Sequence, residues 1–311
     1  MPVLWLRRLI QFGSLLLIFM IPIYESYKSI LYHIPKDSIG NLYQEGFGSL
    51  DSFLKGGYLE PGLLLLDGLV GLLFNNIHAV KRFLDGFSGF FWSITIGGFS
   101  FVDPLASLQV PSKEYSWDVD FLISITLPIL IALVFGRVFC SWICPYNTLQ
   151  ELIRFVAKKL GVSGINKQVL TDHYLRYCIL GIGFVLTVLG VAVFPYILPY
   201  VQLGRIFYYL TLRSIFWVGL IFVIVLLLVD SFVQKGFWCN YLCTTGALLS
   251  LLGRKKFVTI QRDKKVCLES CTLCEKVCVW DSHPKFDDVS NCTHCHLCIN
   301  QCPSKALKIR S

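Results

Sequence analysis

Eight cysteines within a short stretch near the C-terminus constrain this chain more than any other feature. They read C-x3-C-x2-C-x3-C and then C-x2-C-x2-C-x3-C-P. Thiolates at such spacings are ligands of zinc or of iron–sulfur clusters, or they form disulfides. A structural zinc ion takes only four ligands, so eight cysteines with a closing C-P fit paired clusters better. The eight residues are Cys267, Cys271, Cys274, Cys278, Cys292, Cys295, Cys298 and Cys302.

The second cysteine run has the ligand spacing of bacterial ferredoxins, in which the fourth cysteine binds the other of two [4Fe–4S] clusters. Two adjacent runs therefore predict two clusters with crossed ligation, although Val279 replaces the usual proline after the first run. We expect residues 254–311 to form a small α+β, two-cluster ferredoxin-like domain. The expected ligand sets are Cys267, Cys271, Cys274 and Cys302 for one cluster, and Cys292, Cys295, Cys298 and Cys278 for the other.

The composition of the rest of the chain is apolar enough for a membrane protein. Hydrophobic residues make up 55% of the sequence and charged residues 15%, a balance typical of multi-spanning membrane proteins. Apolar windows close to the ~20 residues that cross a bilayer predict four helices in residues 1–253. No small-x-small cleavage site follows the first window, which favours a retained anchor over a signal peptide. We expect an all-α, four-span bundle with spans at about 5–24, 121–139, 177–194 and 215–232.

The charges predict the orientation of these spans. Arg7 and Arg8 place the N-terminus in the cytoplasm by the positive-inside rule. Residues 25–120 then form a long extracytoplasmic segment, and from Glu25 to Asp118 acids outnumber bases ten to six. The tail returns to the cytoplasm, where eleven bases against six acids suit the anionic inner leaflet and disulfides are disfavoured. The sequence thus predicts a multi-pass protein of the cytoplasmic (inner) membrane with both termini inside.

The long outer segment contains two further apolar runs. They are Pro61–Ile77 and Phe83–Val102, the first broken by Asp67 and the second rich in glycine and aromatic residues. We expect interfacial or re-entrant helices there, with two additional spans as the alternative.

An internal repeat predicts a third cluster. The ends of the second and fourth spans share a basic residue, a C-x3-C pair and an aromatic residue between the cysteines. Within a helix this spacing places both thiols on one face, so a duplicated bundle brings four thiols together near the inner surface. The alternative is that these cysteines are buried packing residues, as we expect for Cys178. The four residues are Cys140, Cys144, Cys239 and Cys243.

Several other binding sites find no support in the sequence. No histidine lies inside a predicted span and no C-x-x-C-H motif occurs, which argues against b-type and c-type haem. The chain has no glycine-rich dinucleotide fingerprint and no phosphate-binding loop. Its bases form no stripe interleaved with aromatic residues, so nucleic acid is a poor ligand.

Together these motifs resemble the NapH-type membrane polyferredoxins, whose relatives include the membrane portion of NosR and the MauN-type proteins. The resemblance rests on four spans, Cys140–Pro145, Cys239–Cys243, the two-cluster tail and the outer stretch Gly97–Gln109, which reads G…DP…LQ. It covers roughly residues 85–125 and 130–311. The chain departs from the family at Thr244, where a second proline is usual, and in a longer insertion around 35–85.

The resemblance implies the membrane component of a quinol dehydrogenase. Such a subunit exchanges electrons between quinone or menaquinone and other redox subunits, here an extracytoplasmic iron–sulfur or cytochrome protein. The alternatives are an assembly or maturation factor for a metalloenzyme and, ranked lowest because intramembrane charge is sparse, a transporter.

Two positions for the quinone site follow from the sequence. All expected clusters lie at the inner end of the bundle, which favours a quinone site there in an aromatic pocket formed by Trp142, Tyr146, Trp238 and Tyr241. The alternative interpretation is that these four residues belong to an interfacial aromatic belt. The family resemblance favours an outer site in which Asp103 accepts a quinol proton, although an aspartate before proline is commonly a turn former.

Overall fold

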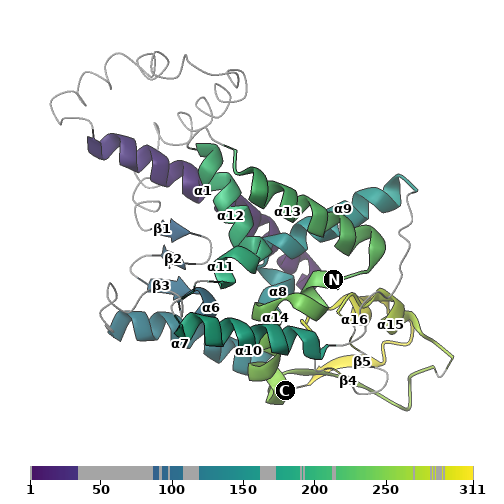
Figure 1. Ribbon diagram of the computed structural model, residues 1–311. Helices are drawn as coiled ribbons and strands as arrows, with labels where there is room; N and C mark the ends of the chain where they lie inside the picture. The colour runs from purple at the N-terminus through teal and green to yellow at the C-terminus, as the bar shows by residue number, and fades with distance from the viewer. Residues whose placement is uncertain are drawn as a thin grey trace.

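Figure 1 shows a computed structural model in which a bundle of helices carries a small cysteine-rich tail at one end. The N-terminal end of the first helix lies beside this tail (Figure 1). The structure describes residues 2–33, 87–90, 93–96, 99–107, 119–161, 173–189, 191, 193–211 and 215–310, the last range without 269, 281, 283, 285–288 and 290.

Helices occupy all four windows that the sequence predicts to span the membrane. Their bounds are Pro2–His33 for α1, Val119–Phe135 for α7, Tyr174–Val188 for α10 and Trp217–Leu228 for α13, which the π-helix η1 extends over Val229–Val233. Within the described residues, one stretch has both the length and the hydropathy of a membrane span, Val3–Pro22 in α1. Shorter apolar stretches are Leu122–Phe135, Tyr174–Val188 and Trp217–Val233.

The described residues of the apolar run Phe83–Val102 form strands, and the expectation of an all-α bundle is wrong at this point. It contains a three-stranded antiparallel sheet with strands β1 (Phe87–Phe90), β2 (Ser93–Ile96) and β3 (Phe99–Val102). Ser93, at the start of β2, pairs with both Phe90 and Val102. Aromatic and β-branched residues, which are frequent in this run, favour strands. The run Pro61–Ile77 lies outside the described residues.

Residues 195–214 contain helices that the sequence did not predict. The short helix α11 (Phe194–Ile197) leads into α12 (Pro199–Thr211), which packs against α1 and α13. Pro199 begins α12, a position where its fixed φ and missing N–H are favourable. This segment is therefore part of the bundle rather than only a connection between two spans.

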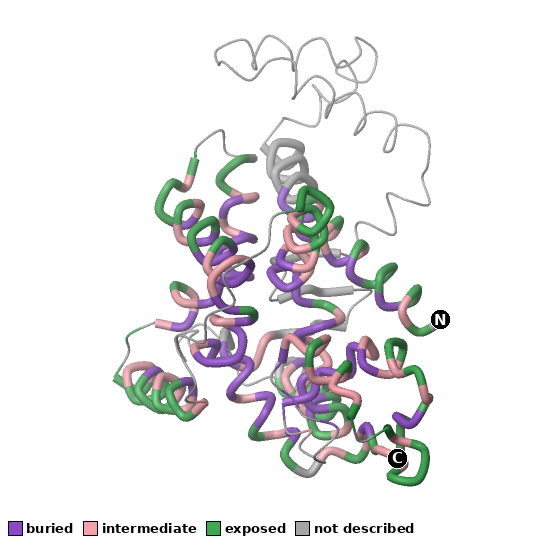
Figure 2. The backbone as a smooth tube through the Cα atoms, turned by 90° about the vertical axis from the view of Figure 1, so that its right-hand side faces the viewer, coloured by how far each residue is buried: buried purple, intermediate pink, exposed green. Residues whose placement is uncertain are grey.

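The two C-x3-C pairs lie at the core of the bundle. Around the first pair are helices α8 (Val138–Trp142) and α9 (Pro145–Lys159), and around the second are η2 (Trp238–Leu242), α14 (Thr244–Leu252) and the 3₁₀ turn η3 (Gly253–Lys255). The core also contains Phe194, Leu198 and Tyr200, while a short helix, α6 (Pro104–Ser107), follows the sheet. Figure 2 shows buried segments where these elements meet and exposed segments on the outer turns.

The tail has the α+β organisation that the sequence predicts. Strands β4 (Thr259–Arg262) and β5 (Leu307–Arg310) form an antiparallel pair that brings the two ends of the tail together. Between them lie α15 (Leu273–Val277) and α16 (Leu297–Gln301), and each of these helices contains the third cysteine of its run, Cys274 or Cys298.

Candidate metal centres

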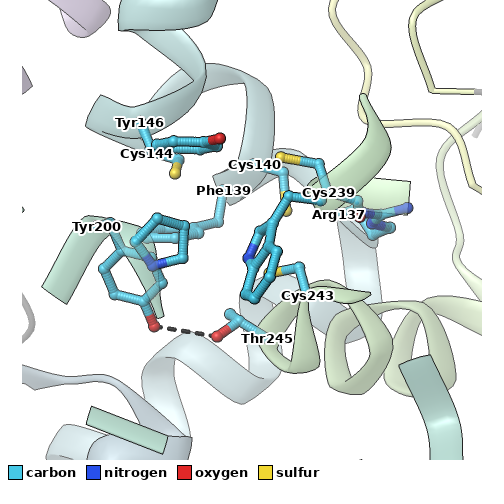
Figure 3. Close-up of a pocket in the computed structure, with 11 residues that line it drawn as sticks. Arg137, Phe139, Cys140, Cys144, Tyr146, Tyr200, Cys239, Cys243 and Thr245 are labelled. Carbon is cyan, nitrogen blue, oxygen red and sulfur yellow. Dashed lines mark hydrogen bonds between the residues drawn. The ribbon is translucent and has the colours of Figure 1, made fainter. Parts of the chain in front are cut away.

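The four cysteines of the internal repeat line one buried pocket between the helices (Figure 3). We call it the inner site, and it is defined by Cys140, Cys144, Cys239 and Cys243, each 8–9% exposed. The chain turns into each C-x3-C stretch at a glycine with a left-handed backbone, Gly136 (φ +68°) and Gly236 (φ +67°). A Cβ at Gly236 would also lie only 2.8 Å from the Asn240 amide nitrogen, so glycine is required there.

Each cysteine pair bridges two helices instead of sharing one helix face, which corrects the expectation from spacing. Cys140 lies within α8, whereas Cys144 has an extended backbone and is the N-cap of α9. Pro145 ends the first helix because it lacks the N–H that a continuous helix needs. Cys243 caps α14 in the same way, with Thr244 beginning the helix, so the departure from proline leaves the geometry intact.

Burial makes the inner thiols poor acids on their own. Burial raises the pKa of Cys243 to about 12, with the neighbouring Cys140 adding to the shift and Arg137 opposing it. Burial likewise raises the pKa of Cys144 and Cys239. A bound metal deprotonates the thiols that coordinate it. Metal binding would therefore compensate the free-energy cost of burying four thiolates in one pocket.

Donors without partners surround this pocket. Arg137 is 1% exposed and donates from Nη2 to the Cys239 carbonyl at 2.7 Å, but its Nε and Nη1 have no hydrogen-bond partner among the described residues. The indole Nε1 of Trp238, which also lines the pocket, is likewise unpartnered. Buried guanidinium N–H groups are costly without an acceptor. An anionic cluster with sulfide and thiolate acceptors fits this lining.

The eight tail cysteines line two further pockets. Their grouping is the one that crossed ligation predicts, because Cys302 joins the first run and Cys278 joins the second. We call them the distal tail site (Cys267, Cys271, Cys274, Cys302) and the proximal tail site (Cys278, Cys292, Cys295, Cys298).

Each tail pocket also has an unpartnered donor in its lining. These are the Arg262 Nε atom at the distal tail site and the Thr293 hydroxyl at the proximal tail site. Among the described residues, no three His, Cys, Asp or Glu side chains converge on one point as ligands of a single ion. A [4Fe–4S] cube requires no such convergence, since each of its irons takes its own cysteine. The donor sets of all three pockets thus suit cubes.

The two tail sites differ in burial. Cys292, Cys295 and Cys298 are buried, whereas all four cysteines of the distal tail site are partly exposed. Burial raises the pKa of Cys278 to about 12. At Cys302 burial also acts to raise the pKa, but hydrogen bonds from Ser304 and from backbone N–H groups outweigh it and lower the pKa. The distal tail site is therefore the one closest to solvent.

The bundle holds the proximal tail site through the carbonyl oxygens of its cysteine loop. The Ser141 hydroxyl donates to the Thr293 carbonyl at 2.7 Å, and the Trp142 indole donates to the His294 carbonyl at 3.0 Å. Arg7 donates from Nη1 to the Cys295 carbonyl at 3.4 Å. Because Ser141 and Trp142 lie between Cys140 and Cys144, the inner and proximal tail sites are direct neighbours.

The second repeat makes a corresponding set of contacts. Asn240, which follows Cys239 as Ser141 follows Cys140, donates to the Val279 carbonyl at 2.9 Å. Arg176 donates to the Asn240 carbonyl at 3.2 Å and to Asn291 Oδ1 at 2.7 Å. Arg7 makes the matching contact to the Ser141 carbonyl at 3.1 Å. One buried arginine therefore joins each repeat to the tail.

Arg137 connects the inner and proximal tail sites directly. Its guanidinium carbon lies 5.4 Å from the centroid of the Trp280 ring, a cation–π arrangement. Trp280 lines the proximal tail site, while Arg137 lines the inner site. A single buried cation and one aromatic ring thus separate two of the three cysteine groups.

The four predicted aromatic residues have two different roles. Tyr146 and Trp238 line the inner site. Trp142 instead binds the tail through His294, and Tyr241 stacks on His173 with ring centroids 4.8 Å apart. Two of the four predicted aromatic residues therefore line the inner site.

Asp103 lies at the edge of the inner site, in contact with Tyr200 of its lining. Its carboxylate accepts a hydrogen bond from the Tyr200 hydroxyl, which lies 3.0 Å from the Thr245 hydroxyl (Figure 3 shows this second contact). Tyr200 and Thr245 both line the inner site. Asp103 also accepts from the Leu105 N–H at 2.8 Å, the turn expected before a proline. The inner and outer positions predicted for a quinone site are thus connected.

A second tyrosine–aspartate pair borders the same pocket, and it was not identified from the sequence. The Tyr146 hydroxyl donates to Asp230 at 2.6 Å, and the Trp238 N–H donates to the other carboxylate oxygen at 2.7 Å. Asp230 is fully buried in the π-helix η1. A single acid within an apolar run was the available signal, because such residues are rare in spans and usually functional.

Comparison with known proteins gives the same picture of the repeat. A family model described as a 4Fe-4S binding domain matches twice, at residues 117–163 and 215–262. Each match contains one C-x3-C pair of the inner site, and the double match confirms the internal repeat. No solved structure matches the chain significantly.

Curated relatives cover most of the described chain. The ferredoxin-type protein NapH of Escherichia coli is 27% identical over 67% of this chain and 74% of its own length. The methylamine utilization ferredoxin-type protein MauN of Paracoccus denitrificans is 27% identical over 65% of this chain and 72% of its own. An uncharacterised protein, MJ0750, of Methanocaldococcus jannaschii is 33% identical over 58% and 74%.

Proposed function

Because the chain belongs to the family of ferredoxin-type iron–sulfur proteins that includes NapH and MauN, we propose that it is a membrane electron-transfer subunit that exchanges electrons between the quinone pool and a partner redox protein. The observation that carries this proposal is the set of three four-cysteine pockets: direct contacts join the inner and proximal tail sites, and cysteines of both tail sites share one hydrophobic cluster. When bound, [4Fe–4S] clusters supply one-electron redox chemistry.

The side chains around the pockets favour a role in electron transfer between sites rather than the storage of a metal at a single site. Arg137 and Trp280 fill the space between the inner and proximal tail sites, and Ser141, Trp142 and Arg7 fix their relative position. The cation of Arg137 stabilises negative charge on either side of it. The burial of the inner and proximal tail cysteines keeps water away from both sites.

The outer surface of the bundle supports a membrane location. Trp5 of α1, Val188 of α10 and Val218 of α13 are each between 72% and 75% exposed. Large exposed apolar surfaces are rare on soluble proteins and mark membrane or protein contacts. We propose that α1, α7, α10 and α13 cross the cytoplasmic membrane as four spans with both termini inside.

Contacts between the termini agree with this sidedness. Arg7, near the N-terminus, is buried against the Cys295 carbonyl and forms an ion pair with Glu151 of α9. Arg7 and Arg8 thus bind the tail and α9 in addition to following the positive-inside rule.

Topology is tested by reporter fusions. A fusion after Ser311 should report the cytoplasm, and a fusion within residues 35–60 should report the opposite side, because one span separates them from the N-terminus. A fusion after Lys159 is the matched control, since that position should agree with Ser311. The same side for all three would exclude the four-span arrangement.

The proposed quinone site lies at the edge of the inner site. Quinol oxidation releases two electrons and two protons, so a proton acceptor beside the pocket is needed. The Asp103 carboxylate, hydrogen-bonded through Tyr200 to Thr245, is such an acceptor. Trp142, one of the aromatic residues expected at an inner quinone site, instead contacts the tail.

Quinol-driven reduction of the iron–sulfur chromophore in the full-length protein tests this function. Asp103→Asn and Tyr200→Phe should each slow reduction by menaquinol about a hundredfold, the scale of a lost general base. Reduction by dithionite and the iron content should stay unchanged. Tyr196→Phe, a substitution of a largely exposed tyrosine on α11, is the control. If wild-type protein with full iron content does not accept electrons from quinol, quinone exchange is excluded and a maturation role is favoured.

A further inference from the structure

We infer that the exposed surface around the distal tail site is the docking face for an acidic soluble one-electron carrier. The inference rests on the proposed electron-transfer function and adds the place where a soluble partner exchanges electrons. It begins from the unequal burial of the three sites. The four cysteines of the inner site and three of the four at the proximal tail site are buried, whereas all four cysteines of the distal tail site are partly exposed. Electron tunnelling falls steeply with distance, so a soluble carrier must dock where a site is near the surface.

The lining of the distal tail site provides the centre of such a face. Leu268 and Leu273 line the pocket and are 54% and 46% exposed, and the neighbouring Val266 is 49% exposed. Pro303, also in the lining, is exposed. Apolar residues around an exposed cofactor site permit close, water-excluding contact with another protein. Figure 2 shows exposed segments near the C-terminus.

The charges around the same site select the partner. Lys264 and Lys265 precede Cys267, and Lys305 follows Cys302 within three residues. All charged side chains classed as exposed among the described residues 259–310 are basic: Lys264, Lys265, Lys276, Lys305, Lys308 and Arg310. The described acids of this range, Asp263 and Glu275, are only partly exposed. A partner with an acidic rim is therefore complementary, and its approach is steered by the positive field.

The position of the lysines favours a protein over a lipid surface. Among the described residues, the side-chain hydrogen bonds from the bundle to the tail reach Val279, Asn291, Thr293, His294 and Cys295, none of which lines the distal tail site. If these lysines bound lipid, the membrane would cover the distal tail site, which is the most exposed of the three. A soluble redox partner instead needs that exposure, because it must approach the cluster closely to exchange an electron. In the exchange itself a reduced carrier loses one electron and the distal tail site gains it, with no proton or bond transferred.

The test measures electron transfer from an acidic flavodoxin, reduced to its hydroquinone, to the full-length cluster-loaded protein in lipid nanodiscs. Stopped-flow absorbance follows the one-electron oxidation of the flavin. Lys264→Glu with Lys265→Glu should lower the second-order rate constant about tenfold at low ionic strength, and the difference should shrink as salt screens the charges. Lys305→Glu should act in the same direction. A basic carrier, cytochrome c, should show the opposite effect of charge reversal when it takes electrons from the reduced protein.

Lys158→Glu with Lys159→Glu is the matched control, because these exposed lysines lie at the end of α9 outside the tail. Iron content measured for every variant establishes that the tail is intact. An unchanged rate, or an equal loss in the control, overturns the docking face. A loss seen in phosphatidylglycerol discs but not in phosphatidylcholine discs also overturns it, because the lysines then bind lipid. Quinol-driven reduction is recorded on the same variants: its absence throughout excludes quinone exchange, whereas a lysine-dependent flavodoxin rate still supports the docking face.

Discussion

Replacing Cys144 and Cys243 together by serine is expected to remove about four of about twelve irons from the full-length protein, the content of one cube among three. Both residues line the inner site and each caps the helix that follows it. Removing one cysteine from each repeat leaves two thiols, too few to hold a cube. The two tail sites share no cysteine with the inner site, so the remaining irons should stay bound.

Iron and acid-labile sulfide assays on anaerobically purified protein measure this loss. Cys178→Ser is the control, because Cys178 faces outward from α10 and lines none of the three pockets. Its exposure is contrary to the packing role expected from sequence. Unchanged iron in the double variant would mean that the inner thiols are packing residues or a dithiol. Loss of all iron would mean that the tail depends on the inner site for folding.

The cysteine groups could be predicted from sequence because ligand spacing is a local property. Three ligands of each tail site lie within eight residues of one another, and the fourth follows from the crossed pattern of two runs. The pairing of the two C-x3-C stretches was also predictable, since a repeat places its copies at equal depth. What spacing did not show is the helix break at Pro145, which puts Cys140 and Cys144 on different helices.

The contacts that connect the sites could not be predicted, because they join residues far apart in the chain. Arg7 meets Cys295, and Tyr200 meets Asp103. Nothing in the local pattern of Arg7 distinguishes a residue that obeys the positive-inside rule from one that binds a cysteine loop. Similarly, a run of glycine and aromatic residues such as 83–102 is compatible with strands or with interfacial helices, and only the packing of β3 against α7 decides between them.

Removing the charge of Arg137 is expected to lower the reduction potential of the inner site and to slow electron exchange with the proximal tail site. The guanidinium is fully buried, donates to the Cys239 carbonyl and has two further N–H groups without a partner. Reduction adds negative charge beside this cation. Two unit charges about 4 Å apart interact by about 4 kcal/mol at an effective dielectric constant of about 20, so even a fraction of that energy shifts the redox equilibrium tenfold or more.

Two variants separate the charge of Arg137 from its shape. Arg137→Met keeps most of the side-chain length and loses the charge, whereas Arg137→Lys keeps the charge and loses the planar set of donors. Redox titration followed by EPR should show a lower potential for the inner site in the methionine variant and a smaller shift in the lysine variant. The distal tail site, which Arg137 does not line, should keep its potential in both.

Gly246→Ala provides a third variant in which the arginine is retained. A Cβ at Gly246 would lie 2.7 Å from Arg137 Nη2 and 3.2 Å from the Cys239 carbonyl oxygen, so the guanidinium must move away from its acceptor. A potential shift in the direction of the methionine variant, with iron content retained, is the expected result. Equal loss of iron in all three variants would indicate that Arg137 acts only through packing. An unchanged potential in Arg137→Met at full iron content would show that its charge does not act on the inner site.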